Sequence, residues 1–187
     1  MDTAGLLLTA EELVKSWAQV VTHPEKNRTD IVISPENLER AVSALISAHW
    51  GYLSAITGLD YPGLSPVASA EKQWNRLTEE TDLDNEQHEG HIEALYHFNN
   101  MDATVTFRVL LHYNQAVLPT LCNIIPSATL YERELIEMFG VTVTGTPSTE
   151  KLLLPDDWPD GVYPLRKSFQ GFPERSETKI QSEGEGR

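Results

Sequence analysis

The chain has 187 residues, a hydrophobic share of 40% and a formal net charge of −14 from 28 acidic and 14 basic residues. That length suits one domain with a modest core, and no apolar run approaches the roughly 18–20 residues that a membrane-spanning helix needs. The negative charge would repel nucleic-acid phosphates and anionic lipids, so neither is expected as a partner. The first residues also lack the basic segment and continuous apolar core of an export signal.

Cys122 is the only cysteine. An internal disulfide is therefore impossible, and the chain alone cannot supply the several thiolates that an iron–sulfur cluster requires. Cys122 lies between Leu121 and Asn123 in an apolar stretch. We therefore expect a buried free thiol rather than a nucleophile.

The N-terminal part predicts two helices and a strand between them. Thr9 and Glu12 have the spacing of a capping box, and the apolar residues behind them recur at helical spacing: Leu13, Trp17, Val20 and Val21. Asp30–Ile33 alternates and is β-branched, which predicts a short strand. Ser34 is then expected to cap a second helix with Pro35 at its first position. The apolar face of this helix is Leu38, Ala41, Val42, Leu45 and Ile46.

The middle of the chain predicts three strands and an insertion. Trp50–Tyr61 is expected to form a strand that ends in a Pro-Gly turn. Residues 65–91 are rich in acidic residues and are interpreted as a solvated insertion, with a helical piece around Glu71–Leu77. Ile92–Asn99 and Thr104–His112 follow as a hairpin. In its second strand the residues expected to face the core are Val105, Phe107, Val109 and Leu111.

A third helix is predicted from Thr129, with Glu132 as capping-box partner, to Gly140, which suits a left-handed C-terminal cap. Its apolar stripe is Tyr131, Leu135, Met138 and Phe139. The charged residues around this narrow stripe favour a surface helix. Arg133 and Glu137 lie one turn apart, and we expect them to form an ion pair.

The chain after this helix combines aromatic residues, prolines and paired charges in Leu152–Trp158 and Tyr163–Lys167. Such a composition cannot form a regular helix or a central strand. Because Trp and Arg are enriched at the energetic centres of interfaces, we interpret the segment as a docking arm.

The predicted plan is a two-layer α+β domain over residues 1–145, with helices packed on a small mixed β-sheet, then an extended docking arm over 146–169 and a polar flexible tail over 170–187.

The stretch from Tyr131 to Lys167 resembles the signature of the 30 kDa subunit family of respiratory complex I (NADH:quinone oxidoreductase, also called NADH dehydrogenase). The matching segments are Tyr131–Glu134, Met138–Gly140, Leu152–Trp158 and Pro164–Lys167. Leu154–Asp160 with Tyr163–Lys167 also resembles the equivalent part of energy-converting, membrane-bound nickel–iron hydrogenases. Gly145-Thr146-Pro147 stands where complex I relatives usually have Gly-His-Pro. Both types of complex therefore stay open.

The resemblance implies a cofactor-free structural and assembly subunit in the hydrophilic arm of an ion-translocating oxidoreductase complex, on the cytoplasmic face of the cell membrane. It implies two partners: a large subunit with the quinone or nickel–iron site, and an iron–sulfur subunit. Iron–sulfur clusters, and any nickel–iron centre or flavin, would belong to those partners, and no catalytic, cofactor-binding or metal-binding residue is implied here. The residues implied at the partner interface, and in folding, are Glu132, Arg133, Glu134, Asp156, Asp157, Trp158, Arg166 and Lys167.

Two alternatives are less well supported by the residues. An independent enzyme lacks a clear site, because His88 and His91 have no third metal ligand beside them, and the neighbouring Asp156 and Asp157 would point apart in an extended chain. The second alternative is a free-standing acidic adaptor outside electron transfer, whose acidic insertion attracts a basic partner.

Overall fold

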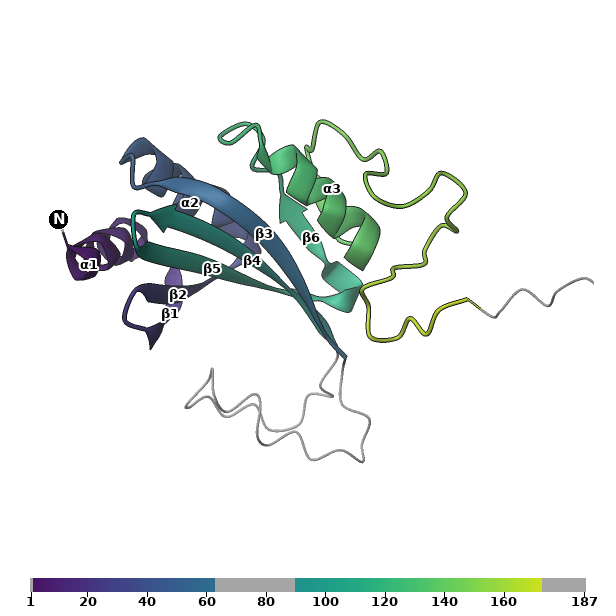
Figure 1. The fold of residues 1–187 in the computed structure, drawn as a ribbon, viewed down its shortest axis with the longest axis horizontal. Coiled ribbons are helices and arrows are strands. Elements are labelled where there is room, and N and C mark those ends of the chain that lie inside the picture. The colour runs from purple at the N-terminus through teal and green to yellow at the C-terminus, as the bar shows by residue number, and fades with distance from the viewer. Residues whose placement is uncertain (1, 63–89, 173–187) are drawn as a thin grey trace, which may run out of the picture.

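The computed structural model describes residues 2–62 and 90–172 (Figure 1). In these residues the α-helices are α1 (Thr3–Val14), α2 (Leu38–Ser47) and α3 (Ala128–Phe139). The strands are β1 (Ala18–Glu25), β2 (Arg28–Ile33), β3 (Tyr52–Tyr61), β4 (His91–Asn100), β5 (Ala103–His112), β6 (Val117–Pro119) and β7 (Thr142–Thr144). Two 3₁₀ helices, η1 (Pro35–Asn37) and η3 (Tyr113–Gln115), complete the set.

The main sheet has five strands in the order β1-β2-β5-β4-β3. Its strand pairs are antiparallel except for β2 and β5, which run parallel with Ile31 opposite Phe107. The sheet is therefore mixed, as predicted. Strands β4 and β5 form the predicted hairpin, with Met101 and Asp102 in its turn. The short strands β6 and β7 pair in parallel as a second sheet.

One face of the main sheet carries the core, and the helices pack against that face. The predicted core residues of β5 are buried, and those of α2 are buried except for the partly buried Ile46. The third helix, α3, packs on β3, where the ring of Phe139 covers Gly58; a Cβ atom built at that glycine would lie 2.3 Å from the ring. Helices and sheet share one hydrophobic cluster, which confirms the two-layer α+β fold.

The first helix differs from the prediction in both position and length. It begins at Thr3, where Asp2 accepts a hydrogen bond from the amide of Gly5 at 2.9 Å, and it ends at Val14. Thr9 lies in the middle of this helix, not at its start, and its hydroxyl donates to the carbonyl of Gly5. The predicted capping box and the extension of the helix to Val21 are therefore wrong. Val20 and Val21 instead lie in β1, where they pair with Val32 and Ile31 of β2.

The ends of α3 bear out one part of its prediction and correct another. Gly140 is the C-cap with φ 69°, in the left-handed region as predicted. At the other end α3 begins at Ala128 after Ser127, without a side-chain cap, so the predicted Thr129–Glu132 capping box is not formed. The carboxylate of Glu132 bonds a different segment, described below.

Several predicted features fall outside the described residues. These are the turn at Gly63, the helical piece around Glu71–Leu77, most of the acidic insertion over 65–91 and most of the tail over 170–187. His91, the predicted end of the insertion, belongs to β4. Across residues 2–62 and 90–172, no helix has the length and apolar character needed to span a membrane.

Candidate functional site

The predicted arm, residues 146–169, lies alongside α3 and then returns to the end of the main sheet (Figure 1). It contains no regular helix or strand, as expected from its prolines and glycines. Side chains of the domain hold it at two places, one near its beginning and one near its end.

Arg133 holds the beginning of the arm through the main chain. Its guanidinium donates from Nε to the carbonyl oxygen of Glu150 and from Nη2 to that of Lys151, each at 2.7 Å. A planar fork that spans two successive carbonyls fixes both the position and the orientation of the segment. No side chain of the arm takes part in these bonds.

Glu137 continues the same arrangement one helical turn later. Its carboxylate accepts from the amides of Leu152 and Leu153 at 2.8 and 2.7 Å, and the residue is only 8% exposed. The predicted ion pair between Arg133 and Glu137 is not formed, because each side chain bonds the arm instead. We call Arg133 and Glu137 the main-chain clamp.

The end of the arm is held at the C-terminus of α3. Arg166 donates from Nε to the carbonyl of Phe139 at 2.7 Å, and its guanidinium lies 4.6 Å from the ring centre of Tyr113 and 5.2 Å from that of Tyr163. Tyr163 in turn covers Gly140, where an added Cβ would lie 2.3 Å from the ring. The cation therefore satisfies a helix-end carbonyl and stacks on two aromatic faces.

A buried carboxylate completes this second attachment. Asp60, at the end of β3, is 6% exposed and accepts hydrogen bonds from the hydroxyl of Tyr113 and from the main-chain amide of Lys167, the latter at 2.6 Å. Burial raises the pKa of Tyr113 above its ordinary value, and the hydrogen bond to Asp60 raises it further. Tyr113 therefore remains a proton donor at neutral pH, and Asp60 ties the arm to the sheet.

Lys151 organises the bend in the middle of the arm. Its ammonium donates to the carbonyl oxygens of Asp156 and Trp158 at 2.9 Å each, and more weakly to that of Pro155 at 3.5 Å. The bend therefore wraps around a cation, while the side chains of Asp156 and Asp157 are exposed.

Trp158 packs the bend against Phe169 and Phe172. Its indole N–H donates to the carbonyl of Val162 at 2.8 Å. Its ring packs against Phe169 and Phe172, with ring centres 5.9 and 5.0 Å away. The three rings form a small aromatic cluster at the C-terminal end of the arm.

Glu132, one of the predicted interface residues, points into the domain. It is 2% exposed and accepts from the amide of Leu121 at 2.6 Å, from the hydroxyl of Thr120 at 2.8 Å and from the thiol of Cys122 at 3.3 Å. The thiol is partly buried, and desolvation raises its pKa, so it stays protonated. This carboxylate fixes the turn before α3.

The predicted interface residues thus fall into different surroundings. Arg133 and Arg166 are engaged with the main chain, whereas Glu134 is partly exposed on α3 and the side chain of Lys167 points to solvent. Their contact with a partner stays a prediction. Sequence reasoning missed the internal roles of Asp60, Tyr113, Glu137 and Lys151. The partners of Asp60, Tyr113 and Glu137 lie far away in the chain, whereas Lys151 bonds carbonyls only four to seven residues ahead.

The outer face of the sheet holds two of the histidines of the described region in partly buried positions. His91 stacks on Tyr61 with ring centres 4.8 Å apart, and His97 lies within hydrogen-bonding distance of Thr57 and Thr106. Burial lowers the pKa of both histidines. His88 lies outside the described residues. Within those residues, no group of three His, Cys, Asp or Glu side chains is placed to hold a metal ion.

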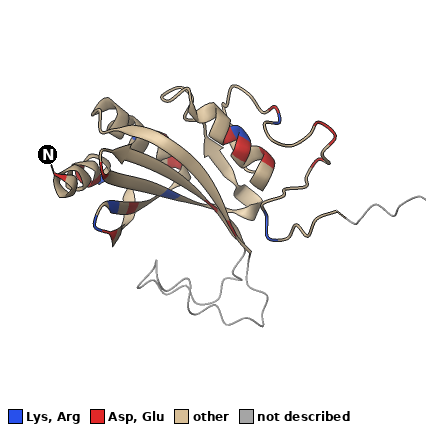
Figure 2. Ribbon diagram, in the orientation of Figure 1, with Lys and Arg blue, Asp and Glu red and all other residues tan. Residues whose placement is uncertain are grey.

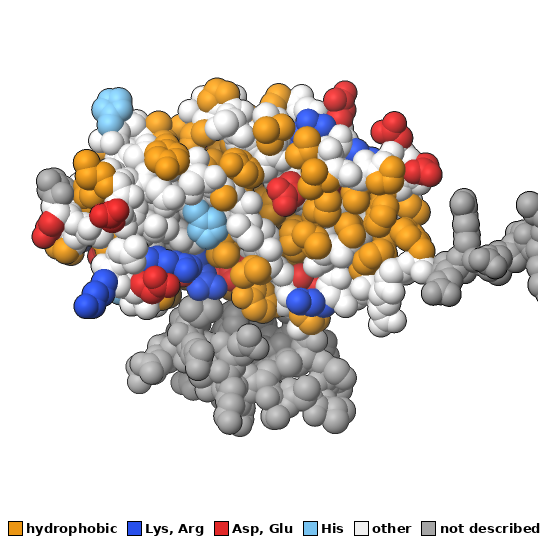
Figure 3. All heavy atoms as spheres, viewed as in Figure 1, with side chains coloured by type: hydrophobic (Ala, Val, Ile, Leu, Met, Phe, Trp, Pro, Cys, Tyr) orange, Lys and Arg blue, Asp and Glu red, His pale blue; other side chains and the backbone are white. Residues whose placement is uncertain are grey.

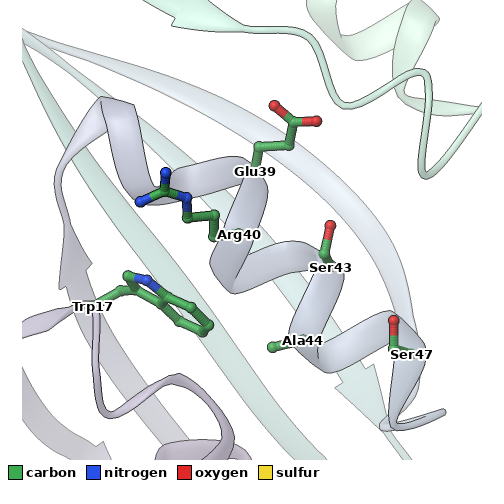
Figure 4. A pocket seen from close by; sticks show the side chains of 6 residues that line it. All are labelled: Trp17, Glu39, Arg40, Ser43, Ala44 and Ser47. Carbon is green, nitrogen blue, oxygen red and sulfur yellow. The ribbon is translucent and has the colours of Figure 1, made fainter.

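A surface groove lies apart from the arm, beside α2 (Figure 4). Its volume is about 570 Å³, and Trp17 lies across from the helix. The lining residues are Trp17, Glu39, Arg40, Ser43, Ala44 and Ser47. The lining thus combines an aromatic ring with one acidic, one basic and two hydroxyl side chains.

Known proteins similar to this chain include subunits of formate hydrogenlyase, of a membrane-bound hydrogenase and of NADH-quinone oxidoreductase. Over 89 residues the chain is 36% identical to formate hydrogenlyase subunit 5 of Escherichia coli, covering 46% of this chain and 16% of that protein. Over 58 residues it is 47% identical to the membrane-bound hydrogenase subunit beta of Pyrococcus furiosus, covering 31% and 34%. It is also 38% identical over 78 residues to the C/D subunit of the NADH-quinone oxidoreductase of Erwinia tasmaniensis, covering 41% and 13%. The matches thus span about a third or less of these curated relatives.

Two solved structures share the fold. One is a trypsin-resistant fragment of Nqo5, with a TM-score of 0.53 and 19% identity over 79% of this chain and 99% of that one. The other is a chain of the membrane-bound sulfane sulfur reductase, an archaeal respiratory membrane complex, with a TM-score of 0.58 and 18% identity over 90% and 86%. The family model of the respiratory-chain NADH dehydrogenase 30 Kd subunit matches residues 31–175, which include the main-chain clamp and the arm. This chain belongs to that family.

Proposed function

We propose that this chain is a structural subunit of a membrane-bound oxidoreductase complex, of either the NADH–quinone oxidoreductase or the membrane-bound hydrogenase type. Its arm docks on the neighbouring large subunit that carries the quinone or nickel–iron site. Family membership supports this role, as do the names of relatives from both kinds of complex.

The observation that carries the proposal is the way the arm is held. The main-chain clamp, Arg166 and Asp60 fix its backbone to the domain, while apolar side chains of the arm remain exposed to water. Exposed apolar groups on a fixed segment lose water contact when a partner covers them, and that loss favours association.

The chemistry of electron transfer belongs to the partners under this proposal. A chain with one cysteine cannot ligate an iron–sulfur cluster alone. Iron–sulfur clusters, and any nickel–iron centre or flavin, are carried by the large subunit and an iron–sulfur subunit. The chain itself is cofactor-free and sits peripherally, on the cytoplasmic face of the membrane.

Co-purification tests the proposal. The tagged full chain, isolated from membranes of its own organism in mild detergent, should bring down a large oxidoreductase subunit and iron–sulfur subunits, identified by mass spectrometry. A chain ending at Gly145, which lacks the arm, is the matched control and should bring down far less. Nickel with hydrogen-dependent activity would identify a hydrogenase, and NADH–quinone activity would identify the other type. A stable monomer without such partners would contradict the proposal.

A further inference from the structure

We infer that the outward face of the arm fits a protein partner whose apolar contact area is bordered by lysine and arginine side chains. We call this surface the arm face; it consists of Leu153 and Leu165 of the arm and Phe172 just beyond it, with Asp156, Asp157 and Asp160 at its edge. The inference rests on the proposed function and adds to it the chemistry that the partner must present.

The apolar part of the arm face lies at the C-terminal end of α3. The amide of Leu153 bonds Glu137, and the amide of Leu165 bonds the carbonyl of the next residue of the helix, Met138, at 3.2 Å. The side chains of Leu153 and Leu165 are 62% and 51% exposed, and Phe172 is 52% exposed. Figure 3 shows hydrophobic side chains gathered over α3 and the arm, on the right of the view.

The arm face has a defined shape before any partner arrives. The main-chain clamp bonds four successive residues, from Glu150 to Leu153, through their carbonyls and amides alone. The side chains of Leu152 and Leu153 are therefore left free to point outward. A partner that binds this surface avoids much of the entropy cost of ordering a loose segment.

The edge of the arm face keeps its negative charge. Asp156, Asp157 and Asp160 are exposed, and none of them forms an ion pair within the part of the chain that the structure describes. Figure 2 shows acidic residues at the outer bend of the arm.

Lys151 and Arg166, two cations of the arm, form no ion pair with these aspartates. Lys151 points its ammonium at main-chain carbonyls, and Arg166 is held by the carbonyl of Phe139 between two tyrosine rings. In the described residues, three carboxylates without an ion-pair partner therefore lie beside an apolar area. Such a border repels acidic surfaces and anionic lipids and attracts basic side chains.

The charge requirement is tested with two triple variants that change the net charge equally. One is Asp156→Asn, Asp157→Asn and Asp160→Asn; the control is Glu12→Gln, Glu36→Gln and Glu39→Gln, at exposed sites on and near α1 and α2. Each immobilised full chain is exposed to detergent-solubilised complex from cells that lack this gene, at several salt concentrations. The first variant should associate about tenfold more slowly at low salt and show a weaker salt dependence, because electrostatic steering is lost.

The apolar requirement is tested by Leu153→Ser with Leu165→Ser, which should raise the dissociation rate about tenfold or more through lost burial. Leu8→Ser is the matched control, since Leu8 on α1 is 65% exposed and distant from the arm. Circular dichroism and the melting temperature verify that each variant is folded.

The outcomes separate this inference from the proposed function. If the wild-type chain binds the complex, and the Leu153→Ser, Leu165→Ser variant and the Leu8→Ser control both bind it as well as the wild type, the inference about the arm face is wrong while the subunit role stands. Equal slowing in the two charge variants would also overturn it, because general charge and not the border would be responsible. If the wild-type chain binds no oxidoreductase subunit, the proposed function and the inference fail together.

Discussion

Gly140 is the residue where the end of α3 meets the arm. Its φ of 69° lies in the left-handed region, and its missing side chain leaves room for the ring of Tyr163. Glycine is therefore required at this position for two independent reasons: the left-handed backbone conformation and the lack of space for a side chain. Gly161 also has a left-handed backbone, with φ 75°, but no atom would lie within 4 Å of a Cβ added there.

We predict that Gly140→Ala lowers the free energy of unfolding by roughly 2–5 kcal/mol, through backbone strain and a clash with Tyr163. Gly161→Ala should cost only the backbone part, roughly 1–2 kcal/mol. Urea unfolding monitored by circular dichroism measures both. Equal losses in the two variants would show that Tyr163 does not press on Gly140.

Glu137 gives a second prediction at this scale. Glu137→Gln replaces one carboxylate oxygen by an amide that cannot accept from Leu152 or Leu153, and it should cost roughly 1–3 kcal/mol. Trypsin should then cut the bond after Lys151 faster, because the arm opens more often. Glu134→Gln, on the same helix but partly exposed, is the control and should leave both measurements unchanged. Unaltered cleavage in Glu137→Gln would contradict a holding role for this side chain.

The sequence could predict the cap at Gly140 but not the partners of the acidic residues. A C-cap depends on local geometry, which the residue type reports directly. Glu132 and Glu137 instead accept from amides 11–16 residues away, and nothing in the pattern of α3 marks these contacts. Charged residues beside an apolar stripe usually lie on the surface, so their burial was missed.

At the scale of elements, prediction succeeded where one periodicity was unambiguous. The helical apolar face of α2 and the alternation along β5 match the buried residues closely. The helix predicted from Trp17 to Val21 was wrong. The apolar residues there fit helical spacing, but pairing with β2 stabilises a strand instead. Tertiary pairing thus overrides a short local pattern.

The outer face of the sheet predicts a pH dependence. Burial lowers the pKa of His91 and His97 below the ordinary value near 6.5, so at mildly acidic pH the unfolded chain binds more protons than the folded chain. The free energy of unfolding should therefore fall as the pH drops through about 6.5 toward the lower folded pKa values.

The variant His97→Gln isolates one of these groups. Glutamine can still bond Thr57 and Thr106 but does not titrate, so the loss of stability between pH 7.5 and 5.5 should be smaller than in the wild type. Urea unfolding at both pH values measures the difference. His49→Asn, at an exposed position with φ 52°, is the control and should keep the wild-type loss. A wild-type loss in His97→Gln would exclude His97 as a contributor.

At the scale of the whole molecule, domain and arm complete each other. Asp60 and Glu137 are buried carboxylates whose hydrogen bonds come in part or entirely from the arm. Glu132 and the β6–β7 pair lie within the domain and do not depend on the arm. We therefore expect the part before the predicted boundary at residue 145 to fold without the arm, and the arm to depend on that part for its structure.

A chain ending at Gly145 should keep its far-UV circular dichroism but melt at least about 5 °C lower than the full chain, since the hydrogen bonds to Asp60 and Glu137 and the cover over α3 are lost. A thermal scan of both chains decides this. An unfolded truncated chain would place the boundary further along the sequence, and an unchanged melting temperature would mean that the arm contributes nothing to stability.

The main-chain clamp also bears on how such a scaffold can diversify. Arg133 and Glu137 recognise peptide groups, which every residue except proline supplies in full, so the outward side chains of Leu152 and Leu153 can be exchanged while the segment stays in place. Lys151 is the exception in this segment, because its ammonium holds the bend. Different residues therefore attach the arm and recognise the partner. Arg133 and Glu137 of α3 attach the arm, and the outward-facing positions are open to substitution. A protein engineer can use the same division to redirect the arm toward a new target without redesigning the domain that carries it.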